Sequence, residues 1–217
     1  MAYQTVLFDL DGTLLDTKAG VIGSLKNVLT SLELPVPPDS VLDEIMGPPV
    51  KFWFSDIYGM PPPEADAAEK KFNYFYETKG LYQSSLFDGV KDVLRFLNAH
   101  GILLGVATSK EMTQAVSVLK YHGIADCFKA IVGPSAGTKG ASKSESMEKA
   151  LSLLDSGKRR DAVFVGDRKY DAEGAKKVGI DFIGVLYGYG KESEFSGYTC
   201  KCLLNAPGDL KQYIITL

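Results

Sequence analysis

Short apolar runs that read as buried strands alternate along this 217-residue chain with segments whose apolar residues recur at helical spacing. Uniformly apolar runs are typical of parallel strands that are covered on both faces. They predict strands over residues 5–8, 103–107, 130–132, 162–165 and 182–185. Strands and helices alternate from about Asp88 onward, which predicts an α/β fold with a doubly wound parallel sheet.

Helices are predicted between these strands because apolar residues stand at i, i+3, i+4 and i+7. The stripes are Val90, Val93, Leu94 and Leu97, then Met112, Ala115, Val116 and Leu119, then Met147, Ala150, Leu151 and Leu154. The first two stripes are followed by His100-Gly101 and His122-Gly123, and a histidine in the last turn with a glycine beyond it ends a helix favourably. We therefore expect both histidines to be structural, which disfavours a histidine nucleophile or general base.

The segment from Thr17 to Ser85 differs from the rest of the chain, because it carries helical spacing and no convincing strand. Its clearest stripe consists of Val21, Leu25, Val28, Leu29 and Leu32. We interpret the segment as a helical insertion. The expected organisation is a core domain of residues 1–16 and 86–217 and an inserted helical domain of residues 17–85.

Two carboxylates, Asp9 and Asp11, stand two residues apart where the first apolar strand ends. Side chains at that end of a strand reach the crevice in which open α/β sheets hold ligands. Two acids this close repel each other, so the pair predicts a bound metal, a raised pKa on one partner, or both. A calcium loop does not fit, because Gly12 follows Asp11 directly instead of standing at the sixth position of the loop.

The stretch Asp9-Leu10-Asp11-Gly12-Thr13 resembles the first motif of the haloacid dehalogenase superfamily of phosphotransferases. Three more motifs are expected in that family, each at the end of another core strand. Thr108-Ser109-Lys110 is similar to the second motif, and Gly166-Asp167 with Asp171 is similar to the fourth. The order and spacing of the motifs extend the resemblance over essentially the whole chain.

The third motif of the family is a lysine between the second and the fourth. Lys143 fits best because it stands directly before a helical stripe. Many relatives follow this lysine with proline, whereas this chain has Ser144, and Lys139 is a weaker rival for the role. The resemblance also implies a Rossmann-like core and makes the insertion an α-helical cap.

The resemblance implies a role for each carboxylate. Asp9 would attack phosphorus, and Asp11 would protonate the leaving oxygen and later take a proton from water. Mg²⁺ would be held by the Asp9 carboxylate, the backbone carbonyl of Asp11 and the Asp167 carboxylate, with Asp171 in support. Gly12 is expected to support the loop that carries Asp9 and Asp11.

Phosphate binding is implied for the polar residues of the second and third motifs. The Thr108 hydroxyl and the Ser109 backbone N–H would bind phosphate oxygens. Lys143 would offset negative charge on both Asp9 and the phosphate. The chain is accordingly expected to be a phosphatase with an aspartyl-phosphate intermediate.

Composition and charge narrow the classes of partner that the chain is expected to bind. The net charge of −3 gives no basic footprint for a nucleic acid polymer. No apolar stretch is long enough to span a membrane, and no signal segment is evident, so we expect a cytoplasmic protein. The three cysteines, Cys127, Cys200 and Cys202, have no metal-binding spacing and are expected to be reduced. Phosphate-binding loops, dinucleotide fingerprints and hydrolase nucleophile elbows are also missing from the sequence.

The substrate is expected to be a small phosphorylated metabolite, and the chain a monomer or weak homodimer. Gly47-Pro48-Pro49-Val50 is similar to an element of phosphoglycolate phosphatase-like members. Nine of the 23 aromatic residues lie between Phe52 and Tyr82, which suits either a base-stacking surface of a 5′-nucleotidase or the core of a small helical lobe. A sugar-phosphate mutase of the β-phosphoglucomutase type and a phospho-aspartate signalling domain are the alternatives.

Overall fold

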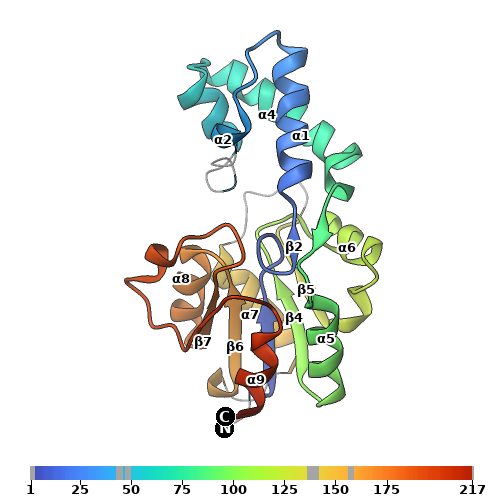
Figure 1. The fold of residues 1–217 in the computed structure, drawn as a ribbon, viewed down its shortest axis with the longest axis vertical. Helices are drawn as coiled ribbons and strands as arrows, with labels where there is room; N and C mark the ends of the chain where they lie inside the picture. The colour runs from blue at the N-terminus through green and yellow to red at the C-terminus, as the bar shows by residue number, and fades with distance from the viewer. Residues whose placement is uncertain (1–2, 43–45, 47–49, 136–141, 156–158, 217) are drawn as a thin grey trace. The chain divides into compact units, whose positions relative to one another are not determined.

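The computed structural model describes residues 3–42, 46, 50–135, 142–155 and 159–216. The chain forms two compact units, one of Met1–Asp16 with Ser85–Leu217 and one of Thr17–Ser84 (Figure 1). The first unit contains the sheet, and the second has helices and no strand among its described residues.

A parallel sheet organises the first unit. Within the described residues it has six strands in the order β5-β4-β1-β6-β7-β8. The strands are β1 (Thr5–Phe8), β4 (Leu103–Ala107), β5 (Ala130–Val132), β6 (Ala162–Gly166), β7 (Asp181–Val185) and β8 (Leu203–Leu204). The predicted doubly wound α/β fold is confirmed, and each predicted strand lies within one residue of its expected bounds. The two-residue strand β8 was not predicted, because so short a run carries no pattern.

Helices follow the strands along the chain and pack on the sheet. They are α5 (Val90–Ala99), α6 (Met112–Tyr121), α7 (Lys143–Leu153), α8 (Lys169–Val178) and α9 (Asp209–Thr216). Short 3₁₀ turns cover Ala125–Cys127, Arg159–Asp161 and Glu192–Phe195. Helix α7 contacts α8, β4 and β5, and α5 contacts α9 and β4 (Figure 1).

Neighbouring residues of the central strand β1 pack in two separate apolar clusters. Leu7 is buried in one cluster with Met147 of α7 and Phe164 of β6. Phe8 instead lines a small apolar cavity with Val93 of α5. This division follows from the alternation of side chains along a strand, and it explains why β1 is buried at every position.

The helical stripes are confirmed for α5 and α7, whose predicted apolar residues are all buried. In α6 the prediction was partly wrong, because Val118 is buried while Met112 and Val116 are only half-buried. Both histidines occupy the expected position at a helix end. His100 and His122 are C-cap residues of α5 and α6, followed by glycines with φ of 73° and 68°.

Two short strands lie where the chain passes between the units. β2 (Leu15–Asp16) pairs antiparallel with β3 (Ser85–Leu86). Neither strand was predicted, since two residues cannot show alternation. Ser85 belongs to the first unit by its contacts.

The second unit is built on two long helices that pack against each other, α1 (Lys18–Ser31) and α4 (Pro62–Thr78). The remaining elements are α2 (Asp39–Leu42), α3 (Val50–Phe52), a π-helical turn at Trp53–Ile57 and a 3₁₀ turn at Gly80–Tyr82. Gly20 of α1 lies so close to the Gly80 carbonyl that a side chain at either position would collide with the other segment.

The aromatic residues of this unit divide between its core and its surface. Trp53 and Phe54 are both buried. They stand in a π-helical turn, whose wider spacing places side chains differently from an α-helix. The exposed aromatics are Phe52, Tyr74 and Tyr82. Within Gly47-Pro48-Pro49-Val50, the first three residues lie outside the described residues.

Candidate active site

The expected site residues follow the carboxyl ends of three adjacent strands. Asp9 continues β1, Thr108 continues β4 and Asp167 continues β6. The ladder extends one step into these residues, because the Asp9 N–H donates to the Val165 carbonyl and the Thr108 N–H donates to the Val132 carbonyl. The sheet therefore holds the backbones of Asp9 and Thr108 in place at the edge where open α/β sheets bind ligands, and Asp167 follows the neighbouring strand end.

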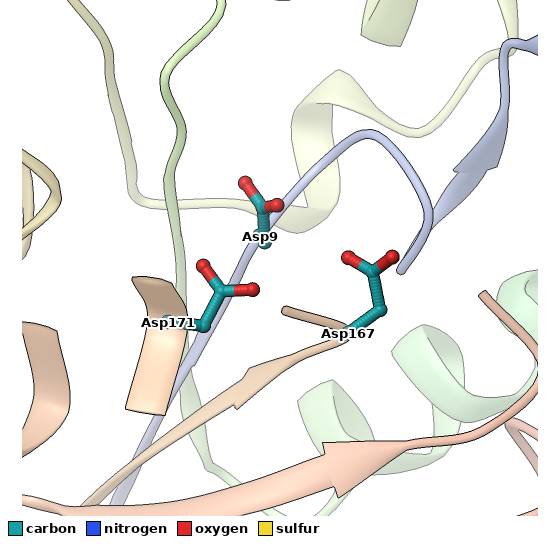
Figure 2. A group of neighbouring side chains, drawn as sticks. All are labelled: Asp9, Asp167 and Asp171. Carbon is teal, nitrogen blue, oxygen red and sulfur yellow. The ribbon is translucent and has the colours of Figure 1, made fainter. Parts of the chain in front are cut away.

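Three carboxylates gather at this edge. Asp9, Asp167 and Asp171 are buried, and each offers an oxygen within 4.8 Å of those of the other two. Figure 2 shows the carboxyl groups of all three directed toward a common region. Asp9 and Asp167 come from strand ends, whereas Asp171 lies in the first turn of α8.

Lys143 joins two of these carboxylates. Its ammonium nitrogen lies 2.6 Å from Asp9 Oδ1 and 3.0 Å from Asp171 Oδ1. The lysine is the first residue of α7, and Ser142 caps this helix by accepting the backbone N–H of Glu145. The cap fixes where the helix starts, and so sets the point from which the lysine side chain reaches the cluster.

Burial and charge shift the pKa values of the cluster. Burial, with Asp9 and Asp171 adding repulsion, raises the pKa of Asp167 to about 7. Burial also raises the pKa of Asp171, and the attraction of Lys143 opposes that rise. Burial acts to lower the pKa of Lys143, but Asp171 and Asp9 outweigh it and hold the lysine charged. The cluster therefore carries more negative charge than its surroundings stabilise.

The residues present fit a divalent cation. Three carboxylates and one ammonium leave two negative charges in excess when all are ionised. Carboxylate oxygens are the ligands that Mg²⁺ prefers, and a divalent ion would cancel this excess. A cation here would favour the ionised form of Asp167 and so oppose the rise in its pKa.

The backbone packs closely around Asp167. Gly12 has φ of 83°, and a Cβ atom there would collide with the Asp167 carboxylate. On another side, the Tyr189 N–H donates to Asp167 Oδ2 over 2.9 Å. Gly188 and Gly190 also leave no room for a Cβ against Asp167. Residues 188–190 therefore pack directly against Asp167.

Asp11 is held by a residue for which no role was predicted. Lys110 Nζ lies 3.0 Å from Asp11 Oδ2, and the lysine side chain is only 6% exposed. Lys110 is the third residue of the Thr108-Ser109-Lys110 motif. The available signal was a lysine three residues beyond the end of β4, the strand that neighbours β1.

The family follows from a sequence comparison. The family described as haloacid dehalogenase-like hydrolase matches residues 6–185 of the chain. This range begins in β1, ends with β7 and contains Asp9, Asp167 and Asp171. The chain belongs to the haloacid dehalogenase-like hydrolase family.

Two proteins with different named activities are similar to this chain at nearly the same sequence identity. The chain is 36% identical over 189 residues to the tyrosine-protein kinase PtkA of Mycobacterium tuberculosis, covering 87% of this chain and 64% of the kinase. The chain thus spans less than two thirds of the length of that relative. It is 33% identical over 200 residues to a 5′-nucleotidase of Pseudomonas aeruginosa, covering 91% of this chain and 89% of the nucleotidase.

Solved structures of the family are similar over nearly the whole chain. A protein assigned as a phosphatase in Clostridium difficile superimposes with a TM-score of 0.95 at 35% identity, covering 99% of this chain and all of the other. The structure of PtkA superimposes with a TM-score of 0.85 at 33% identity, covering 99% of both chains.

The remaining expected residues of this haloacid dehalogenase-like chain have these positions. Thr108 is buried, and its hydroxyl oxygen accepts the Lys110 N–H over 3.1 Å. Ser109 is exposed beside it. Lys139 lies outside the described residues. Ser144 stands in the first turn of α7, and its hydroxyl lies 3.0 Å from that of Ser142.

Other features of the chain stand apart from this site. Cys127, Cys200 and Cys202 are free thiols, as expected. Burial raises the pKa of Cys202 to about 11, which makes its thiolate rare at neutral pH. Among the described residues, no helix has the length and apolar character needed to cross a membrane.

Proposed function

We propose that this haloacid dehalogenase-like hydrolase is a Mg²⁺-dependent phosphomonoester hydrolase that acts on a small phosphorylated metabolite. The observation that carries the proposal is the arrangement around Asp9. Its carboxylate stands at the central strand end, 2.6 Å from Lys143 and within the acidic cluster with Asp167 and Asp171. A fixed, charge-compensated carboxylate at the ligand-binding edge is suited to nucleophilic attack.

The reaction would proceed in two steps. In the first, an Asp9 oxygen bonds to phosphorus, the bond from phosphorus to the leaving oxygen breaks, and Asp11 gives that oxygen a proton. In the second, Asp11 takes a proton from water as the water oxygen attacks the aspartyl phosphate. Lys143 stabilises the negative charge that builds up on the transferred group, and Thr108 and Ser109 offer it hydrogen bonds.

Mg²⁺ would be held by Asp9, the Asp11 carbonyl and Asp167, with Asp171 in support. It would supply positive charge that attracts the phosphate and offsets the negative charge of its oxygens. The net excess of two negative charges at the cluster supports this assignment.

A 5′-nucleotide is the substrate class that the relatives favour most. The 5′-nucleotidase relative is matched over 89% of its length. The helical unit exposes Phe52, Tyr74 and Tyr82, and aromatic faces of this kind stack on bases. A small acid such as phosphoglycolate is the other substrate that fits the proposal.

A second candidate is transfer of the phosphoryl group to an acceptor other than water. The 36% identity to the tyrosine-protein kinase PtkA is the observation that favours it. Tyrosine phosphorylation and sugar-phosphate mutation would both use the same aspartyl phosphate. They differ from hydrolysis only in what attacks it.

The test is phosphate release with Mg²⁺ from phosphoglycolate, 5′-nucleotides and hexose phosphates. Asp9→Asn is run alongside, with Asp126→Asn as the matched control because Asp126 is exposed. We expect release by the parent chain and the control, and none by Asp9→Asn with its fold intact. Intact mass after a brief incubation should show a phosphoryl group that Asp9→Asn cannot acquire.

Each other result has a definite meaning. Turnover by Asp9→Asn refutes Asp9 as nucleophile. Isomerised hexose phosphate without phosphate release indicates a mutase, and phosphotyrosine on the chain or on an added peptide indicates the kinase activity. A folded parent chain with no activity on any of these substrates refutes the proposed hydrolysis.

A further inference from the structure

Lys110 and Asp11 form an ion pair inside the first unit. Lys110 Nζ lies 3.0 Å from Asp11 Oδ2, and the lysine side chain is 6% exposed against 31% for the aspartate. A surface ion pair of two mobile side chains contributes little. This lysine is largely buried, so its position is set by the fold and it can set the position of the carboxylate in turn.

The backbone of Lys110 is itself fixed at two points. Its N–H donates to the Thr108 hydroxyl oxygen over 3.1 Å. Its carbonyl lies so close to Gly133 that any side chain at position 133 would collide with it. The backbone of Lys110 is therefore fixed in a turn that follows β4. Strand β4 pairs with β1, which leads into Asp9 and Asp11.

The two oxygens of Asp11 have different surroundings. Oδ2 accepts from Lys110. Oδ1 is enclosed and has no hydrogen-bond partner among the described residues. Asp11 is therefore anchored through Oδ2, and rotation of its carboxyl group would break the contact with Lys110.

We propose that Lys110 is a positioning residue that holds the Asp11 carboxyl group in the orientation from which it exchanges protons with the substrate. The inference rests on the proposed function, in which Asp11 is the general acid and base. When the bond between phosphorus and the leaving oxygen breaks, the proton passes from the Asp11 carboxyl group to that oxygen. Lys110 remains on Oδ2 throughout and keeps the carboxyl group from rotating.

A direct contact of Lys110 with phosphate is the competing role. A phosphate-binding lysine would assist every substrate equally, because all of them carry the same transferred group. A lysine that orients the general acid matters most where the leaving oxygen needs a proton. The dependence on the leaving group therefore separates the two roles.

The experiment compares Lys110→Met with the parent chain on 4-nitrophenyl phosphate and phenyl phosphate. The two esters are similar in size, but 4-nitrophenolate leaves readily without a proton and phenolate does not. We expect Lys110→Met to lower kcat/KM for phenyl phosphate about tenfold or more beyond any loss with 4-nitrophenyl phosphate. Asp11→Asn should discriminate in the same direction. Lys120→Met, at an exposed lysine of α6, should behave as the parent chain.

The double variant Lys110→Met/Asp11→Asn completes the test. If the lysine acts through Asp11, the double variant should be within about twofold of Asp11→Asn on phenyl phosphate. Equal losses on both esters, or losses that multiply in the double variant, overturn the inference and leave the proposed hydrolysis intact. A parent chain that hydrolyses neither these esters nor the metabolites refutes the proposed function, and the role of Lys110 falls with it.

Discussion

Lys143 Nζ lies 2.6 Å from Asp9 Oδ1 and is buried with it. The same nitrogen is 3.0 Å from Asp171 Oδ1, so one ammonium separates two buried carboxylates. Desolvation of three such charges is costly, and their mutual attraction offsets that cost only while the geometry is kept. This geometry is maintained by the end of β1, by the cap of α7 at Ser142 and by the first turn of α8.

Replacing this lysine should therefore damage both chemistry and stability. Lys143→Met leaves two buried carboxylates without their shared cation, and we expect unfolding to become easier by about 3–5 kcal/mol in metal-free buffer. Phosphatase activity should fall about a hundredfold or more, because charge on the transferred group is no longer offset. Thermal unfolding and phosphate release measure the two effects. Lys149→Met on the exposed side of the same helix is the control, and an equal response of both variants would contradict the role of Lys143.

Gly12 offers a comparison of steric contact with backbone strain. Gly12 and Gly123 both have positive φ, but only at Gly12 would a Cβ meet a neighbour, the Asp167 carboxylate. Gly123→Ala should cost about 1–2 kcal/mol from backbone strain alone. Gly12→Ala should cost more and should also remove activity, because it displaces Asp167. Denaturant unfolding and activity of the two variants check this, and retention of activity in Gly12→Ala would show that the loop can yield.

Much of this architecture could be predicted because buried parallel strands are apolar at every position. Residues 6–8 and 162–165 are of this kind, and the strands that contain them lead directly to Asp9 and Asp167. The residues with chemical roles stand where the apolar pattern stops. That is a local signal, and no tertiary information is needed to read it.

The second layer of the site could not be predicted in this way. Lys110 reaches Asp11, and the Tyr189 N–H reaches Asp167, only through contacts between neighbouring strand ends. Neither position breaks a pattern, because a lysine or a glycine-flanked tyrosine after a strand is typical of a solvated turn. The π-helical turn that buries both Trp53 and Phe54 is likewise set by packing, not by spacing.

Mg²⁺ should stabilise the folded chain through Asp167. A ligand at a hundred times its dissociation constant stabilises by about 2.7 kcal/mol, so thermal unfolding should shift upward as Mg²⁺ is added to metal-free protein. Asp167→Asn removes a carboxylate of the cluster and should lose this shift. Asp126→Asn should keep it. A shift of equal size in Asp167→Asn would place the ion elsewhere.

Metal-free protein should also show the effect of pH on Asp167. Its pKa rises from 3.8 to about 7 on folding, so between these values the folded state binds its proton more tightly than the unfolded state does. The stabilising contribution of this proton is complete below pH 4 and is lost as pH rises toward 7. Asp167→Asn lacks this loss, so relative to the parent chain it should gain up to about 4 kcal/mol between pH 4 and pH 8. Urea unfolding in the presence of a chelator measures the difference, with Asp126→Asn following the parent chain. If Asp167→Asn ran parallel to the parent chain across this range, Asp167 would be ionised already at pH 4 and the excess negative charge of the cluster would be compensated by the protein itself.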